Sequence, residues 1–163
     1  MALESPLTWA SLTLALPDEA ATHGLAVRVA AASRRGDLIA LSGELGSGKT
    51  SFARAFIRAR GLAGEVPSPT FTLVEIYDAG GALPVWHFDL YRLKSASEII
   101  ELGLDEALAE GVSLIEWPER LGAAMPAERL ELALAPGSDA GARIATLTAS
   151  PGWASRLAGL AHG

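Results

Sequence analysis

The sequence contains no cysteine, and this absence excludes several kinds of chemistry. Disulfide bonds, a thiol nucleophile and a cysteine-ligated zinc site all require side chains that the chain does not have. Proteins without disulfide bonds are typical of reducing compartments. We therefore expect a cytoplasmic location.

Long hydrophobic runs are also missing, although 50% of the residues are hydrophobic. No run approaches the roughly 20 apolar residues that a helix needs to cross a bilayer. The first residues, MALESPLTWASLTLALPDE, lack the basic leader of a signal or transit peptide, so we expect neither. We expect no membrane partner.

Basic residues are in the minority, with 13 lysines and arginines against 19 aspartates and glutamates and a formal net charge of -6. This balance argues against a surface dominated by contacts to nucleic-acid phosphates. Only two lysines are present, Lys49 and Lys94.

The hydrophobic pattern predicts both helices and strands. We expect one domain over residues 1–163, of α/β class with a mixed sheet, because two pairs of strands read as hairpins. The last expected helix has Trp153, Leu157 and Leu160 on one face, which favours packing into the core. The expected strands are 11–16, 37–42, 70–77, 83–89, 112–117, 128–135 and 142–149, and the expected helices are 17–33, 49–60, 95–111 (one or two), 118–124 and 152–163.

A glycine-rich segment lies between the strand expected at 37–42 and the helix expected from Lys49. Residues 43–50, GELGSGKT, match the pattern G-x-x-x-x-G-K-[ST] at every position. Glycines let successive backbone N–H groups point into one hollow, and the next helix aims its positive end there. The segment predicts a phosphate site, with Lys49 on the β- and γ-phosphates and the Thr50 hydroxyl on Mg²⁺. The predicted nucleotide-binding residues of this segment are Gly43, Glu44, Leu45, Gly46, Ser47, Gly48, Lys49, Thr50 and Ser51.

Two carboxylates stand where apolar runs stop, Asp89 after PVWHF and Glu116 after VSLI. Strands of such a sheet deliver side chains to the phosphate edge at these positions. Either acid can hold Mg²⁺ while the other orients an attacking water, and the spacing does not assign the two roles. A period of two places His87 on the side of Asp89, where we expect a hydrogen-bonded structural histidine.

Thr70 follows two prolines in EVPSPTFT, which stiffen the segment before it. The segment resembles a switch that senses the γ-phosphate, and an ordinary entry into a strand is the alternative interpretation. Proteins that recognise guanine nucleotides normally carry an Asn-Lys-x-Asp motif, which this sequence lacks. We therefore expect adenine, with ATP as the substrate.

Five motifs in order, GELGSGKTS, SPTFTLVEIY, HFDLYRL, ELGLDEAL and IEWPERL, resemble the TsaE (YjeE) family across residues 12–148. The resemblance implies a P-loop NTPase-like three-layer sandwich and a cytoplasmic Mg²⁺-dependent ATPase of bacterial tRNA threonylcarbamoyladenosine biosynthesis. It also implies two partners, TsaD and TsaB, which form threonylcarbamoyladenosine at position 37 of tRNAs reading codons that begin with A. The tRNA would be met only through that complex.

The same resemblance assigns roles to individual residues. Lys49 becomes a phosphate ligand, Thr50 and Glu116 ligands of the metal, and Asp89 an acid needed for hydrolysis. Trp117 would lie beside the nucleotide and Thr22 on its adenine side.

Two other functions are compatible with a phosphate loop. One is a small-molecule kinase, which needs an acceptor pocket and a lid, although no arginine-rich lid segment occurs between Arg92 and Glu116. The other is a binding module that nucleotide switches without being hydrolysed.

Overall fold

The structure, a computed structural model, describes residues 8–44, 46–61, 73–78, 83–95 and 97–161. Its helices and strands follow the predicted order along the chain, and the segment expected at 95–111 forms two helices. The elements are β1 (Ala10–Leu16), α1 (Glu19–Ala32), β2 (Leu38–Ser42), α2 (Lys49–Ala59), β3 (Val74–Tyr77), β4 (Val85–Asp89), α3 (Glu98–Glu101), α4 (Leu104–Glu110), β5 (Val112–Glu116), the 3-10 helix η1 (Pro118–Ala124), β6 (Leu130–Pro136), β7 (Arg143–Ala149), α5 (Pro151–Leu157) and the 3-10 helix η2 (Ala158–Leu160).

The described strands form one seven-stranded sheet in the order β1-β7-β6-β2-β5-β4-β3. Strand β2 is parallel to both β5 and β6, and β4 is parallel to β5. The two expected hairpins, β3–β4 and β6–β7, are antiparallel, and β1 adds an antiparallel edge strand beside β7. The predicted mixed sheet is therefore confirmed.

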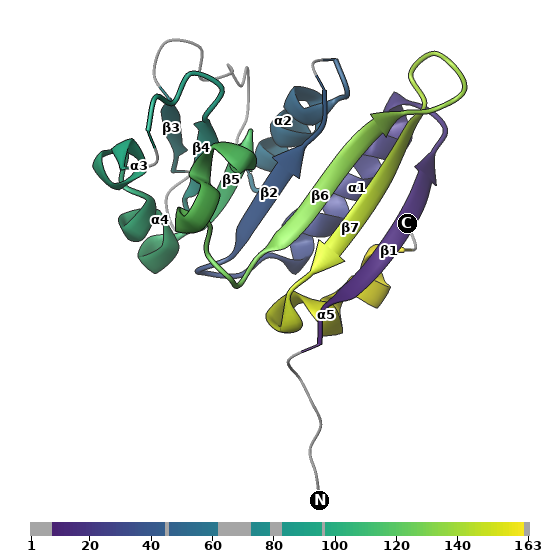
Figure 1. The fold of residues 1–163 in the computed structure, drawn as a ribbon. Coiled ribbons are helices and arrows are strands. Elements are labelled where there is room, and N and C mark those ends of the chain that lie inside the picture. Colours follow the sequence, from purple (N-terminus) through teal and green to yellow (C-terminus); the bar gives the residue numbers. More distant parts are fainter. Residues whose placement is uncertain (1–7, 45, 62–72, 79–82, 96, 162–163) are drawn as a thin grey trace, which may run out of the picture.

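Helices cover both faces of the sheet, but not to the same extent (Figure 1). Helices α1, α2 and α5 pack on one face, where Leu25, Phe52 and Trp153 share a buried cluster with the sheet. On the other face, α3, α4 and η1 bury a second cluster that includes Trp86 and Phe88 of β4. No described helix covers that second face over β1, β7 and β6, so the three layers are complete only over the β2–β5–β4 half.

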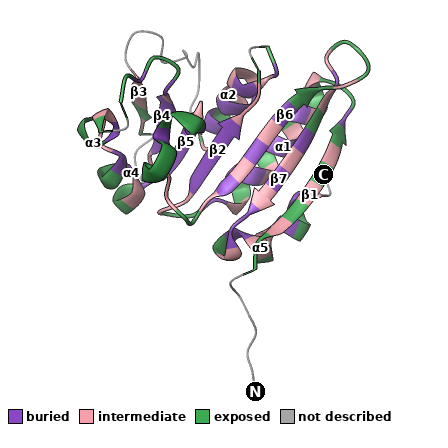
Figure 2. Cartoon of the chain, in the orientation of Figure 1, coloured by how far each residue is buried: buried purple, intermediate pink, exposed green. Residues whose placement is uncertain are grey.

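Burial along the strands follows from this arrangement (Figure 2). Every residue of β5 is buried, because both of its faces are covered, whereas β1 alternates between exposed and partly buried residues before its buried last residue. The expected core face of the C-terminal helix is confirmed, since Trp153, Leu157 and Leu160 are all buried. Continuous apolar runs thus mark the central parallel strands and alternation marks the edge.

Two sequence signals set the ends of helices. Asp18 caps α1, its carboxylate accepting a hydrogen bond of 2.8 Å from the N–H of Ala21. Gly111 follows the last residue of α4 in an extended conformation, and the chain there passes so close to Pro84 that a Cβ at residue 111 would lie 2.2 Å from the Pro84 carbonyl oxygen.

The parallel strands bring their carboxyl ends to one edge of the sheet. Glu116 of β5 pairs in register with Asp89 of β4 on one side and with Leu41 of β2 on the other. One residue past Leu41, β2 ends at Ser42 and the glycine-rich loop begins. This edge therefore carries the candidate site. None of the helices in the described part of the chain has the length and apolarity needed to cross a membrane.

Candidate active site

The glycine-rich loop turns the chain from β2 into α2 through a tight path. Gly43 has a φ of 141°, and a Cβ there would lie 2.5 Å from both the Leu134 carbonyl oxygen and the Ser47 hydroxyl. Gly48 has a left-handed φ of 101° and stands directly before α2. Among the residues that the structure describes, no side chain caps this helix, so backbone N–H groups of its first turn are left for another acceptor.

Lys49, the first residue of α2, is buried, and its ammonium group is held by the loop itself. Its Nζ donates to the carbonyl oxygens of Gly43 and of Glu44, the latter at 3.2 Å. The same atom lies 4.3 Å from the centroid of the Trp117 ring, a cation–π contact. The charge of Lys49 is thus placed at the loop by carbonyl dipoles and an aromatic face.

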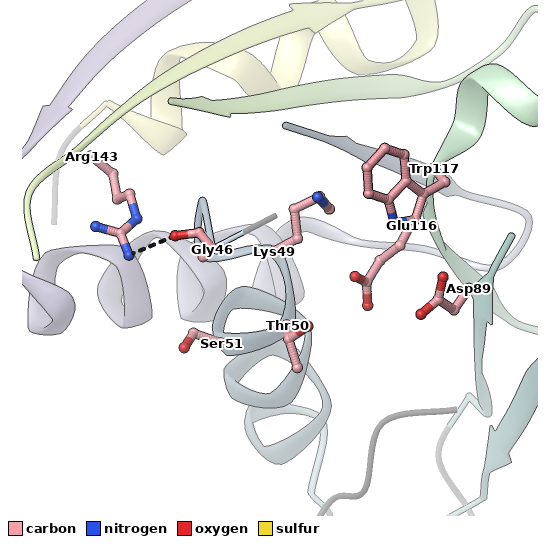
Figure 3. Close-up of a pocket in the computed structure, with 9 residues that line it drawn as sticks. Gly46, Lys49, Thr50, Ser51, Asp89, Glu116, Trp117 and Arg143 are labelled. Atoms are coloured by element: carbon pink, nitrogen blue, oxygen red, sulfur yellow. Dashed lines mark hydrogen bonds between the residues drawn. The ribbon is translucent and has the colours of Figure 1, made fainter. Parts of the chain in front are cut away.

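A cavity of about 280 Å³ opens beside this lysine (Figure 3). It joins the loop and the start of α2 to the ends of β4 and β5, with Thr50 on one wall and the carboxylates of Asp89 and Glu116 on the other. Its lining consists of Gly46, Gly48, Lys49, Thr50, Ser51, Asp89, Glu116, Trp117 and Arg143.

Burial and charge both act on Asp89. Desolvation raises the pKa of its carboxyl above the ordinary value of 3.8, and the nearby carboxylate of Glu116 raises it further. The N–H of Tyr91, which donates to Asp89 Oδ1 at 3.2 Å, works in the opposite direction. Asp89 is therefore an acid with increased proton affinity at the wall of a polar cavity.

Glu116 is 3% exposed and has a defined partner, His87 of β4. The His87 Nε2 lies 2.7 Å from Glu116 Oε2. This hydrogen bond uses one ring nitrogen of His87, and the other, Nδ1, has no partner among the described residues. The expected hydrogen-bonded histidine is confirmed, and its bond fixes the direction of the Glu116 side chain.

Trp117 is the only non-glycine residue in the described part of the chain with a positive φ, 60°. This left-handed turn directly after β5 swings the indole over Lys49, and its ring centroid lies 4.9 Å from that of Tyr91. Such strain in a bulky residue is held by the surrounding structure and is common at functional sites. A second cavity of about 530 Å³ borders the indole, lined by Gly43, Glu44, Tyr91, Trp117 and Glu119.

Some predicted site residues do not join the first cavity. Gly43 and Glu44 line the second one, and the buried hydroxyl of Ser47 has no hydrogen-bond partner among the described residues. Thr22 is buried in α1 and is not part of either lining. Leu45 and Thr70 lie outside the described residues, so the predicted switch stays a prediction.

Arg143 is a cavity residue that sequence reasoning missed. It begins β7, and its guanidinium reaches back to the glycine-rich loop 96 residues earlier in the chain. An arginine at the start of an alternating strand carries no local motif. Only its place beside the turn of the last hairpin, at the edge of the sheet where the parallel strands end, identifies it.

The oxygen atoms at the cavity suit a hard cation. The Thr50 hydroxyl and the carboxylates of Asp89 and Glu116 are ligands that Mg²⁺ prefers, and Mg²⁺ usually takes few of them from the protein. Over the described ranges, no group of three or more histidine, aspartate or glutamate residues is arranged to enclose a metal ion by itself. The residues fit a metal that is shared with a phosphate ligand.

Comparison with known proteins points to one family. The family model "Threonylcarbamoyl adenosine biosynthesis protein TsaE" matches residues 16–144. The tRNA threonylcarbamoyladenosine biosynthesis protein TsaE of Bacillus subtilis is 40% identical over 124 residues, covering 76% of this chain and 75% of that protein. Its counterpart in Rickettsia conorii is 44% identical over 107 residues, covering 64% of this chain and 59% of that protein.

A solved structure agrees with these matches. The crystal structure of Bacillus subtilis YdiB superposes with a TM-score of 0.77 at 32% identity and covers 93% of each chain. The mixed sheet with a glycine-rich loop between β2 and α2 defines an α/β protein with a P-loop NTPase-like fold. Within that class, the chain belongs to the TsaE family.

Proposed function

We propose that this protein is a cytoplasmic Mg²⁺-dependent ATPase that supports a TsaD–TsaB pair in tRNA threonylcarbamoyladenosine formation. The modification would be placed at position 37 of tRNAs reading codons that begin with A. Membership of the TsaE family supports the pathway. The resemblance of the sequence motifs supports the partners.

One observation carries the enzymatic part of the proposal. A single cavity joins Lys49 and Thr50, at the start of a helix, to Asp89 and Glu116, at the ends of two parallel strands. Cation, hydroxyl and backbone N–H groups on one wall fit phosphate oxygens, and the acids on the other wall fit a metal and a water.

These residues of the cavity would each have a role in hydrolysis. Lys49 would leave the carbonyls of Gly43 and Glu44 and balance the charge of the β- and γ-phosphates, while Thr50 and Glu116 would hold Mg²⁺. The bound metal would neutralise charge that develops on the transferred phosphoryl group. Asp89 would orient the attacking water and take up its proton, for which a raised pKa is suited.

Release of ADP without any added acceptor tests the reaction class. We expect slow turnover of ATP with Mg²⁺, and no stimulation by small-molecule acceptors, whereas a kinase would release almost no ADP until its acceptor was added. Glu116→Gln and Asp89→Asn should each lower turnover by a factor of about 100 or more. Both variants should still bind ATP.

A matched control comes from Glu101→Gln, which removes an exposed carboxylate of α3, outside the cavity lining, and should leave turnover unchanged. Equal turnover of the wild type, Glu116→Gln and Asp89→Asn would contradict the roles of these acids. A wild type that binds ATP without hydrolysing it would instead indicate a nucleotide-gated binding module.

The partners can be tested by capture. We expect the protein to retain a purified TsaD–TsaB pair only when ATP is present and Lys49 is intact. Capture that is indifferent to nucleotide would contradict the proposal that the nucleotide state governs the complex.

A further inference from the structure

Arg143 connects the last hairpin of the sheet to the glycine-rich loop. The residue pairs in register with Leu16 of β1 and with Pro136 of β6, so its backbone is held on both sides. It has the same parity along β7 as Ala145, which is buried in the cluster under α1 and α2. Its side chain therefore starts from a rigid position on the helix-covered face of the sheet.

From this position the guanidinium holds two successive carbonyl groups of the loop. Arg143 Nε donates to the Ser47 carbonyl oxygen at 2.7 Å, and Nη2 donates to that of Gly46 at 3.3 Å. Nη1 donates to the carbonyl oxygen of Ala142 at 3.0 Å, so the guanidinium group is also held from the side of β7. Figure 3 shows the guanidinium on one side of Gly46 and Lys49 on the other.

Anchoring these carbonyls also orients the N–H groups of the same peptide units. In a trans peptide, the carbonyl of one residue and the N–H of the next point in opposite directions. Because Arg143 holds the Ser47 carbonyl, the Gly48 N–H points away from the guanidinium. The N–H of Ser47, which belongs to the peptide unit anchored at Gly46, donates to the Glu44 carbonyl oxygen at 3.0 Å and closes the turn.

The Arg143 side chain packs closely against the loop at Gly48. A Cβ at Gly48 would lie 3.1 Å from Arg143 Nε, so even a methyl group at this position would require the guanidinium to shift by a few tenths of an ångström. The contact also depends on arginine, because a planar fork can reach two neighbouring carbonyl oxygens whereas the single ammonium group of a lysine is a point donor.

We propose that Arg143 is a positioning residue that holds residues 46–48 in the conformation that binds phosphate. It acts through the backbone of the loop, from β7, while α2 holds the loop from its other end. This inference rests on the proposed binding of ATP. The effect of Arg143 on the conformation of the loop, however, exists in the unliganded protein and can be measured without any nucleotide.

The experiment compares wild type, Arg143→Ala and Arg143→Lys with Arg129→Ala as the matched control. Arg129 precedes β6 at the other end of the sheet and likewise donates to backbone carbonyl oxygens, those of Pro126 and Ala127. Two quantities are measured: backbone ¹⁵N order parameters of Gly46, Ser47 and Gly48 without nucleotide, and the Kd for ATP and ADP with Mg²⁺. Circular dichroism establishes that each variant is folded.

In Arg143→Ala we expect the order parameters of these three residues to fall and the Kd for both nucleotides to rise by about ten-fold or more. Arg143→Lys should lie between Arg143→Ala and the wild type, and it serves alone if Arg143→Ala does not fold. Arg129→Ala should match the wild type in both quantities.

Unchanged order parameters in Arg143→Ala and Arg143→Lys would overturn the proposal, even if affinity fell, because Arg143 would then act by direct contact with the ligand. If the wild type bound no nucleotide, the proposed function would fail, and the order parameters would still decide whether Arg143 holds the loop.

Discussion

The Nε2 atom of His87 lies 2.7 Å from Oε2 of Glu116, and the two side chains are 1% and 3% exposed. Their strands are parallel neighbours, but the residues are not register partners: His87 lies opposite Leu114, two residues before Glu116. The hydrogen bond thus runs diagonally across two strands on the face that α2 covers. It restricts the direction in which the Glu116 carboxylate can face the cavity.

The first prediction concerns this hydrogen bond. Replacing His87 by Ala should lower ATP turnover about 10- to 100-fold and raise the Mg²⁺ concentration needed for half-maximal turnover, since the partner that orients the proposed metal ligand Glu116 is removed. Mg²⁺ titration of turnover is the measurement. The control is His23→Ala, because His23 is exposed and lies 3.6 Å from Glu19 on α1, away from the cavity. An unchanged Mg²⁺ dependence in His87→Ala would contradict the orienting role.

The second prediction uses the two lysines of the chain. Lys49→Ala should weaken ATP binding about 100-fold or more, because it removes the buried cation that lies between the loop carbonyls and the Trp117 ring. Lys94→Ala removes an exposed ammonium group and should have no effect on affinity. Titration calorimetry with ATP and Mg²⁺ measures both variants. Equal affinities would show that the phosphates do not meet Lys49.

The third prediction follows from the raised pKa of Asp89. The native state binds the Asp89 proton more tightly than the unfolded chain does, so this carboxyl favours folding at low pH and opposes it increasingly as pH rises above 3.8. Asp89→Asn should therefore melt at a higher temperature than wild type near about pH 7, and the difference should shrink near about pH 4.

Thermal melts at the two pH values, with the exposed Asp139→Asn as control, measure this difference. The same Asp89 variant should lose ATP turnover at both values, so stability and activity change in opposite directions. A lower melting temperature for Asp89→Asn at neutral pH would be the contrary result.

The fourth prediction separates the scaffold from the site. Asp37, just before β2, and Arg156 of α5 form a bidentate ion pair with N–O distances of 2.7 and 3.1 Å, and each side chain is 11% exposed. Asp37→Ala should lower the free energy of unfolding by about 3 kcal/mol, because Arg156 would be left without its partner in a largely buried place.

Urea unfolding of Asp37→Ala, Arg156→Met and the double variant gives the coupling energy of the pair. The more exposed pair of Arg129 and Glu131 is the comparison and should contribute less than about 1 kcal/mol. Turnover per folded molecule should stay unchanged in Asp37→Ala, since the pair lies at the end of the sheet opposite the cavity. Absence of coupling between Asp37 and Arg156 would contradict this prediction.

Much of the fold follows from local patterns. The apolar run at 112–116 predicts a buried strand, and β5 is indeed covered on both faces. The alternation at 142–149 predicts a strand with one open face, as β7 has. The glycine-rich segment between β2 and α2 is likewise local, since glycine spacing and the helix that follows are properties of adjacent residues. The carboxylates of Asp89 and Glu116 are found from sequence because each ends a strand.

The contacts that shape the site could not be predicted in this way. Which strands are neighbours, and in which register, depends on the packing of the whole sheet, so no local pattern places His87 against Glu116 or Arg143 against the loop. The left-handed turn at Trp117 is similar, because its strain is tolerated only where the surrounding structure holds the indole over Lys49.

By itself, the sequence determined the order of helices and strands, the glycine-rich loop and the positions of Asp89 and Glu116 at strand ends, because hydrophobic periodicity, glycine and chain breaks act over a few residues. The tertiary structure alone decided which side chains orient the loop and Glu116. Residues that are 27, 29 or nearly 100 positions apart in the chain meet only after the sheet has formed, and their contacts then fix the directions of the side chains.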